Sequence, residues 1–159
     1  MPIVLEPIGF VRGGRAAAED DDWGRSRASI ELDAARFGPD ALTGLGEFSH
    51  IEVVFHFHGV DEATVETGAR RPRGNPDWPL VGIFAQRGKA RPNRLGVSVC
   101  RVLGVKGLVI EVEGLDAIDG TPVLDIKPVL KGFLPRGVLR EPRWAGEIMR
   151  EYWRAEGKA

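Results

Sequence analysis

Charged side chains gather in residues 114–128, GLDAIDGTPVLDIKP, between short apolar runs. Asp125 and Lys127 stand two residues apart in a strand-like run, so both side chains project to the same face of that strand. A carboxylate such as Asp119 can accept a proton from a reacting group, and an ammonium can position a substrate. Opposite charges inside an apolar run would be explained if both charges face a functional site, so the stretch is a candidate wall of one. Charges and prolines are equally typical of a solvated edge strand, so both interpretations stand at this point.

Residues 82–98, GIFAQRGKARPNRLGVS, form a second stretch whose side chains could bind a ligand. Between positions 70 and 101 the chain has eight basic residues and a single acid, Asp77, a local net charge of +7. Guanidinium groups donate paired hydrogen bonds to carboxylates and phosphates, and a local basic patch attracts anions. We expect an anionic partner here, with a solvated basic loop as the alternative. The nucleotide-binding patterns GxxxxGK[ST] and GxGxxG are absent from the sequence.

Length and composition exclude several classes of protein. The 159 residues suit one domain with its own core, and a net charge of −1 indicates no general affinity for nucleic acid. Cys100 is the single cysteine and lies in an apolar run, which predicts a buried, unreactive thiol and no disulfide. Three histidines without a CxxC or HExxH pattern predict no metal site. Without a long apolar segment or signal-peptide pattern, we expect a cytoplasmic protein that makes no membrane contact.

Short strands separated by turn signals must position these residues. Residues 51–57, IEVVFHF, are the clearest strand, because β-branched and aromatic residues alternate so that Ile51, Val53, Phe55 and Phe57 share one face. Residues 96–105 and 108–113 read as paired strands with a turn at Lys106 and Gly107. Further strands are expected within residues 3–11, 29–32 and 80–85. Turn signals about every ten residues are typical of an antiparallel barrel or sandwich.

Helical periodicity appears only near the end of the chain. After Pro142, Trp144, Ile148 and Tyr152 recur at four-residue spacing, which predicts an amphipathic helix with an aromatic stripe. That stripe could pack on the barrel or cover a partner subunit. The fold class expected is mainly β, a small antiparallel β-barrel with short helices and a C-terminal amphipathic helix. The expected domains are a barrel over residues 1–138 and a helical tail over residues 139–159.

Several blocks, taken together and in order, resemble the TsaA-like family, which includes the TrmO-type S-adenosylmethionine-dependent tRNA methyltransferases. The blocks are residues 7–12, FSH at 48–50 with the strand after it, GIF at 82–84, Arg87, RPN at 91–93, Gly96, Ser98, Leu115, Asp116, and 119–128. The resemblance covers about residues 3–135. The chain departs from the family pattern where Asp22, Trp23 and Gly24 stand in place of a Pro-Arg-Gln element. It also has Arg94 and Leu95 where the family has RPNPIG, Val129 after IKP, and no further domain after the barrel.

The resemblance implies a small β-barrel that dimerises and binds S-adenosylmethionine without a Rossmann fold. It implies N6-methylation of threonylcarbamoyladenosine next to the anticodon of a tRNA, with the cofactor site near the subunit interface. Carried over by position, the cofactor-binding residues are Asp22, Trp23, His58, Gly59, Arg87, Val97, Glu113, Gly114, Leu115 and Asp116. The candidate catalytic residues are Asp119, Asp125 and Lys127, and the candidate substrate-binding residues are Lys89, Arg91, Asn93 and Arg94.

Two alternatives to this function remain at the level of sequence. The chain could be an S-adenosylmethionine-binding protein that methylates a different acceptor, because it stops soon after the barrel. It could instead be a non-enzymatic module that senses the cofactor. Binding of bulk tRNA that weakens with salt would favour the tRNA substrate over a different acceptor. Calorimetry with the cofactor, followed by an assay of Arg87→Ala, would test the sensing module.

Overall fold

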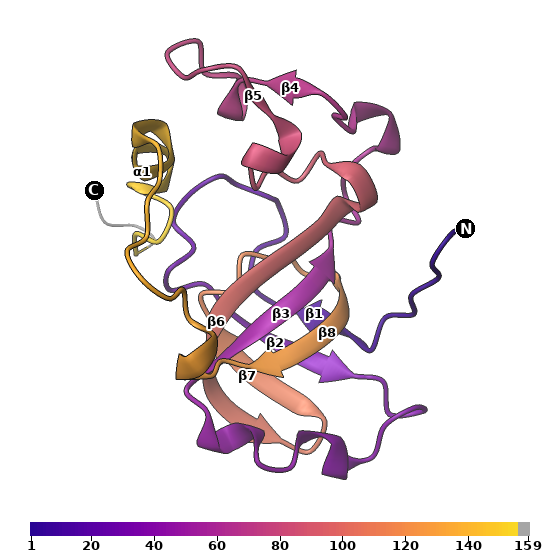
Figure 1. Cartoon of the computed structure of the whole chain (residues 1–159). Coiled ribbons are helices and arrows are strands. Elements are labelled where there is room, and N and C mark those ends of the chain that lie inside the picture. The colour runs from indigo at the N-terminus through magenta and orange to yellow at the C-terminus, as the bar shows by residue number, and fades with distance from the viewer. Residues whose placement is uncertain (156–159) are drawn as a thin grey trace.

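The structure is a computed structural model that describes residues 1–155, and its centre is a closed antiparallel barrel (Figure 1). Around the barrel the strands follow the order β1-β2-β7-β6-β3-β8, and β1 pairs with β8 to close it. A separate two-stranded sheet pairs β4 with β5. The strands are β1 (Gly9–Arg12), β2 (Arg27–Leu32), β3 (His50–His56), β4 (Ala69–Arg70), β5 (Val81–Gly82), β6 (Leu95–Lys106), β7 (Val109–Glu113) and β8 (Pro122–Pro128). The predicted mainly β barrel is confirmed.

Only the connection between β6 and β7 is a two-residue turn, and the other strands are joined by loops of eight or more residues, several of which contain 3₁₀ turns. The 3₁₀ turns are Pro39–Leu42, Leu45–Glu47, Glu62–Thr64, Pro72–Gly74, Ile83–Ala85, Pro92–Arg94 and Lys131–Phe133, and the single α-helix of the described residues is α1 (Arg143–Met149). Within residues 1–155 no helix is long and apolar enough to span a membrane. Most of the chain's regular structure is therefore in the barrel.

The central strand β3 follows the predicted alternation. Ile51, Val53 and Phe55 are buried in the barrel core, whereas Glu52 on the opposite face is exposed. β3 pairs with β6 on one side and β8 on the other, so its apolar face is fully enclosed. Alternation of apolar and polar residues fixes this register, because a slip by one residue would turn every apolar side chain outward.

Replacing Ile51 by alanine tests how much the packing of this buried face contributes to stability. The side chain is completely buried, so the variant leaves a cavity in a core that cannot fully collapse. We expect the free energy of unfolding to fall by about 2–5 kcal/mol, measured by urea denaturation. Alanine at the exposed neighbour Glu52 is the control and should change stability far less. Equal losses for both variants would contradict this account of the core.

The predicted hairpin between β6 and β7 is confirmed. The two strands pair antiparallel from Lys106 and Val109 onward, and Gly107 takes the positive φ of 60° that the turn requires. Cys100 on β6 is buried, as expected from its apolar neighbours. Burial, followed by the nearby charge of Asp116, raises the pKa of this thiol to about 12, so it is a protonated and unreactive core residue.

Strand β8 closes the barrel at its N-terminal end. It pairs with β3 from Ile51 to Phe55 along most of its length, whereas β1 pairs with it only at Pro122 and Val123. Within the described residues, the part that carries Asp125 and Lys127 therefore has a strand partner on one side only, as the edge-strand interpretation expects. Asp125 and Lys127 do share one face as expected, and that face is the outer wall of the barrel.

Two of the expected strands are much shorter in the structure. Of residues 3–11 only Gly9 onward forms strand, and Ile3, Val4 and Leu5 remain exposed outside the barrel. Of residues 80–85 only Val81–Gly82 pairs, because the chain turns into the 3₁₀ turn Ile83–Ala85. Apolar composition alone suggested strands at both places, but neither segment has a long partner to pair with.

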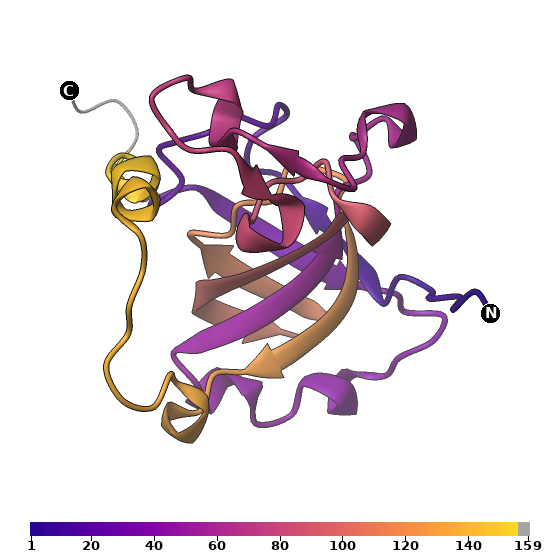
Figure 2. The same ribbon diagram turned by 45° about the horizontal axis from the view of Figure 1, so that its top comes forward.

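The C-terminal helix is shorter than its periodicity predicts. α1 spans Arg143–Met149, so Tyr152 lies beyond its end rather than on a continuous stripe with Trp144. After α1 the backbone folds against the loop before β2, where it accepts hydrogen bonds from Asp22 and Trp23 (Figure 2). The final residues of the expected tail, 156–159, lie outside the described residues.

Candidate functional site

The segment after β7 brings the first candidate residues to the end of the barrel. Gly114 has a φ of 81°, and its amide nitrogen donates to the carbonyl oxygen of Ser26 at 2.8 Å. Leu115 and Ala117 then pack into the hydrophobic core, and Leu115 is only 2% exposed. These anchors fix the backbone on both sides of Asp116. The position of its carboxylate is therefore set by the core.

Asp116 contacts a residue far along the chain. One carboxylate oxygen, Oδ2, accepts a hydrogen bond from the hydroxyl of Tyr152. The other oxygen, Oδ1, is buried and finds no partner among residues 1–155. A buried carboxylate oxygen without a donor is costly, by roughly 1–3 kcal/mol, so a missing donor is a reason to suspect a ligand.

Arg87 and Val97, both expected in the cofactor site, lie together. Nη2 of Arg87 donates to the carbonyl oxygen of Val97 at 2.6 Å, and the rest of the guanidinium group is exposed. The charge of Arg87 also acts on Tyr152. The structure thus brings Arg87, Val97, Asp116 and Tyr152 into one neighbourhood.

Asp22 and Trp23 join this neighbourhood through the tail. Their amide nitrogens donate to the carbonyl oxygens of Glu151 and Tyr152 at 3.1 and 2.8 Å. Trp23 is buried, and the guanidinium of Arg15 lies 4.2 Å from the centre of its indole ring. Asp22 has an unusual φ of 68°, which these contacts on both sides maintain. The loop 13–26 is therefore held in place at this end of the barrel.

Glu113 has a role in the barrel wall. Its carboxylate is hydrogen-bonded to Arg27 on β2 at 3.0 Å and to Arg101 on β6 at 2.9 Å, directly across from it on both sides. The hydrogen bond from Arg27 holds the pKa of Glu113 below its ordinary value, and the charges of Arg27, Arg101 and Arg25 act in the same direction. Since its carboxylate is engaged, Glu113 has mainly its backbone to offer a ligand.

A Glu113→Gln variant should alter the acid sensitivity of the barrel. A carboxyl whose pKa is lowered by folding stabilises the folded state at pH values above its unfolded pKa of about 4.3. That stabilisation is lost as the pH falls from there through the lower pKa of the folded state. We expect the variant to be less stable than wild type at pH 7 and to lose less stability between pH 5 and pH 3. Urea titrations at several pH values measure this. Glu111→Gln, an exposed position on the same strand, is the control; the same loss there would contradict the prediction.

His58 and Gly59 lie beside a different group of candidate residues. The imidazole of His58 lies beside Gly120, and the adjacent Asp119 carboxylate accepts from the amide of Gly13 at 2.9 Å. Asp119 is exposed at this turn. Within residues 1–155 no three histidine, cysteine, aspartate or glutamate side chains gather as metal ligands. The arrangement offers a carboxylate and an imidazole at the surface.

Asp125 and Lys127 form an ion pair with each other on the outer wall. Nζ of Lys127 lies 2.6 Å from Oδ2 of Asp125, and Ile126 donates its amide to Oδ1 at 2.9 Å. The hydrogen bond to Asp125 raises the pKa of Lys127 above its ordinary value. Both side chains are partly exposed. On the paired strand β3, Asp125 lies opposite Val54 and Lys127 lies opposite Glu52. A ligand that used either residue would have to compete with this pair.

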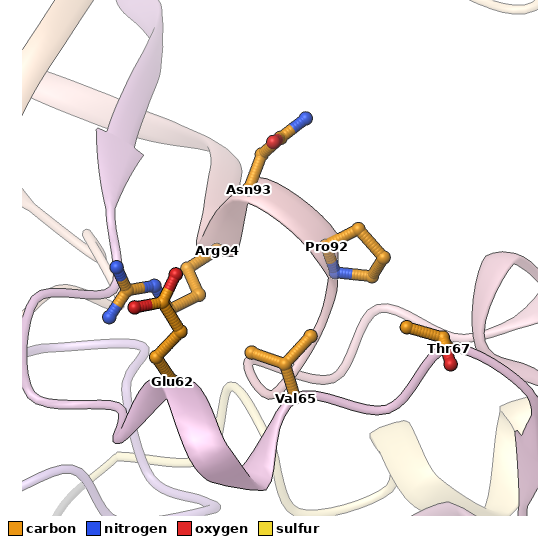
Figure 3. A pocket seen from close by; sticks show the side chains of 6 residues that line it. All are labelled: Glu62, Val65, Thr67, Pro92, Asn93 and Arg94. Atoms are coloured by element: carbon orange, nitrogen blue, oxygen red, sulfur yellow. The ribbon is translucent and has the colours of Figure 1, made fainter. Parts of the chain in front are cut away.

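The basic loop divides into exposed and structural residues. Lys89 and Asn93 are exposed, whereas Nη1 of Arg91 donates to Gln86 at 2.7 Å and Nη1 of Arg94 donates to Val60 at 2.9 Å. Arg94 also borders a cavity of about 500 Å³ (Figure 3). The cavity is lined by Glu62, Val65, Thr67, Pro92, Asn93 and Arg94. Of the four expected substrate-binding residues, Arg91 and Arg94 therefore support the loop, and Lys89 and Asn93 are exposed on it.

Acidic residues of the chain itself neutralise part of the positive charge of residues 70–101. Arg73 pairs with Asp20 and Asp21 of the acidic run, and Arg101 pairs with Glu113. Sequence position did not reveal these pairs, because the acidic run and Arg73 are about fifty residues apart. Arg87 and Lys89 remain the exposed cations of the loop.

Sequence reasoning did not assign Tyr152 to this site. Its four-residue spacing from Ile148 indicated a helix face, and nothing local linked it to Asp116. The tail contacts Trp78 as well, whose indole nitrogen donates to Glu147 at 2.8 Å. The signal that could have found Tyr152 is chemical, since a tyrosine hydroxyl requires a polar partner when its ring is half-buried.

Comparison with known proteins identifies the family. The family model described as tRNA-methyltransferase O N-terminal domain matches residues 20–133. A Mus musculus protein named tRNA (adenine(37)-N6)-methyltransferase is 33% identical over 138 residues, which are 82% of this chain and 32% of that protein. A Methanothermobacter thermautotrophicus protein named probable S-adenosyl-L-methionine-binding protein is 36% identical over 134 residues, 80% of this chain and 90% of that one.

A solved structure agrees with these matches. The crystal structure of TrmO from Pseudomonas aeruginosa superposes with a TM-score of 0.73 at 28% identity, covering 91% of this chain and 62% of that one. The chain spans about a third of the length of the mammalian relatives it matches. With most of its length matched by one family model and the barrel shared with TrmO, the chain belongs to the family of the tRNA-methyltransferase O N-terminal domain.

Proposed function

We propose that this protein is an S-adenosylmethionine-dependent methyltransferase that methylates N6 of threonylcarbamoyladenosine next to the anticodon of a tRNA. The observation that carries the proposal is the match of residues 20–133 to the tRNA-methyltransferase O N-terminal domain. Relatives named as tRNA methyltransferases and as S-adenosylmethionine-binding proteins support the reaction and the cofactor.

The residues around Asp116 suit this cofactor chemically. S-adenosylmethionine carries a carboxylate, an ammonium and ribose hydroxyls, and when bound it supplies an electrophilic methyl group on sulfur. The exposed guanidinium of Arg87 offers donors for the carboxylate. Oδ1 of Asp116, which has no partner among residues 1–155, is able to accept a hydrogen bond from a hydroxyl or an ammonium. Asp22, Trp23 and residues 113–115 lie at the same end of the barrel.

The acceptor nitrogen must lose a proton during methyl transfer, and a carboxylate is the natural acceptor for it. Asp119 is exposed beside His58 and takes this role in our proposal. The Asp125–Lys127 pair positions the acceptor from the outer wall of the barrel. Lys89 and Asn93 on the basic loop contact tRNA phosphates, while Arg91 and Arg94 hold that loop in shape.

We further propose a homodimer with the cofactor site near its interface, in the cytoplasm. Exposed apolar side chains support a self-association surface: Val97, Val99 and Leu103 alternate along the outer face of β6. Phe133 and Leu134, on the segment that leads from β8 to α1, are exposed as well. Apolar patches of this kind are rare on monomers and typical of interfaces.

A Val99→Glu variant tests the dimer. Placing a charge at a half-exposed position in the middle of the β6 face should shift the protein to monomer at micromolar concentration, measured by sedimentation velocity. Val4→Glu, which adds the same charge outside the barrel, should leave the dimer intact. A wild-type protein that sediments as a monomer would refute the dimer directly.

Methyl transfer decides the function. Purified protein with labelled S-adenosylmethionine should methylate tRNA that carries threonylcarbamoyladenosine without the N6-methyl group. Binding of that tRNA should weaken steeply as salt rises, because phosphate contacts release counterions. Cofactor binding without transfer to this tRNA would refute the proposed substrate and leave another acceptor or cofactor sensing. Binding that does not respond to salt would argue against phosphate contacts by the basic loop.

A further inference from the structure

The C-terminal tail supplies a side chain to the same site as Asp116. The Tyr152 hydroxyl donates to Oδ2 of Asp116, which leaves Oδ1 buried and without a partner in the part of the chain that is described. When one oxygen of a carboxylate is held by a hydrogen bond, the orientation of the second oxygen is fixed as well. That is the geometry expected of a side chain prepared to accept one more hydrogen bond.

Several independent contacts place the tail there. The amides of Asp22 and Trp23 bond to the carbonyl oxygens of Glu151 and Tyr152, and Arg154 lies 2.7 Å from the carboxylate of Asp22. Figures 1 and 2 both show the segment that follows α1 beside the loop before β2. Because its own backbone is anchored on this loop, Tyr152 is constrained at both its hydroxyl and its main chain.

Electrostatics keeps Tyr152 a hydrogen-bond donor. Burial, and then the charge of Asp116, raises the pKa of the Tyr152 phenol far above its ordinary value. The guanidinium groups of Arg73 and Arg87 oppose this shift only in part. The phenol therefore remains protonated at any physiological pH and always presents its hydroxyl to Asp116.

We propose that Tyr152 is a positioning residue of the cofactor site. Its hydroxyl holds Asp116 so that the second carboxylate oxygen, Oδ1, accepts a hydrogen bond from S-adenosylmethionine. This inference rests on the proposed function, since it assumes that the cofactor binds at Asp116. It adds a wall to that site from the C-terminal tail, beyond residues 20–133 that the family model covers. Tyr152 acts through Asp116 and makes no contact with the reacting atoms.

Calorimetric titration of the full chain with S-adenosylmethionine tests the inference. Tyr152→Phe keeps the ring and removes the hydroxyl, and we expect the Kd to rise about tenfold or more, as for loss of a hydrogen bond to a charged group. In turnover, KM for the cofactor should rise by a similar factor while kcat at saturating cofactor stays within about twofold. The double variant Tyr152→Phe with Asp116→Asn should bind no more weakly than Asp116→Asn alone, because the tyrosine acts through the aspartate.

Trp78→Phe is the matched control, since it also removes one hydrogen bond that holds the tail, at Glu147, and should leave the Kd within about twofold. Tighter or unchanged binding by Tyr152→Phe would overturn the inference, as would additive effects of the two substitutions. An equal loss in Trp78→Phe would also overturn it, because the hydroxyl would then matter only for folding of the tail. Wild type that binds no S-adenosylmethionine would refute the proposed cofactor and this inference with it. Normal wild-type binding with an unaffected Tyr152→Phe would refute the inference alone.

Discussion

Replacing Arg87 by alanine should weaken S-adenosylmethionine binding by about 30-fold or more. Arg87 is exposed at the end of the barrel, anchored through one nitrogen to the carbonyl of Val97, and its charge reaches the phenol of Tyr152. In our proposal the remaining donors bind the carboxylate of the cofactor, so truncation leaves that carboxylate without a cation. Calorimetry at fixed ionic strength measures the change in Kd.

Two further variants identify the cause of such a loss. Arg87→Lys keeps the charge and removes the paired donors, so it should recover only part of the affinity. Lys106→Ala removes a cation at the distant β6–β7 hairpin and should leave the Kd unchanged, which shows whether general loss of positive charge matters. If Arg87→Ala binds the cofactor as tightly as wild type, the assignment of Arg87 to the cofactor site is wrong.

Replacing Gly24 by alanine should detach the C-terminal tail from the barrel. A Cβ at this position would lie 2.0 Å from the carbonyl oxygen of Trp153, far inside contact distance. The clashing atoms belong to the backbone of Trp153, so no side chain can rotate to relieve the clash. We expect the free energy of unfolding to fall by about 1–3 kcal/mol, the usual cost of overpacking, because the tail must move away. S-adenosylmethionine affinity should fall as well, since Tyr152 then loses Asp116.

Limited trypsin digestion reports on the tail directly. Arg150 and Arg154 should become rapid cleavage sites in Gly24→Ala and remain protected in wild type, because local detachment exposes the backbone. Gly104→Ala on β6 is the control, since a Cβ there would meet no atom within 4 Å. Wild-type protection of both arginines in Gly24→Ala would mean that the tail tolerates the methyl group, contrary to our reading of this contact.

The alternation of residues 51–57 and the turn at Gly107 were sufficient to predict β3 and the β6–β7 hairpin. Both signals are local, because side chains in a strand alternate between faces and a tight turn requires particular residues. The candidate residues from Arg87 to Asp116 came instead from contiguous blocks that resemble a family pattern. Apolar composition without alternation failed at residues 80–85, where only Val81–Gly82 found a partner.

The sequence by itself therefore determined β3, the β6–β7 hairpin and the barrel class, and its resemblance to a family named the candidate residues near Asp116 and Arg87. Tertiary structure alone decided that β8 closes the barrel against β1 at Val123 and that Asp125 and Lys127 face outward. It also decided that Glu113 joins two arginines in the barrel wall, and that Tyr152 returns to Asp116. The physical reason is that these contacts join residues distant in the chain, such as Trp23 and Tyr152. Such contacts depend on barrel closure and leave no periodic pattern in the sequence.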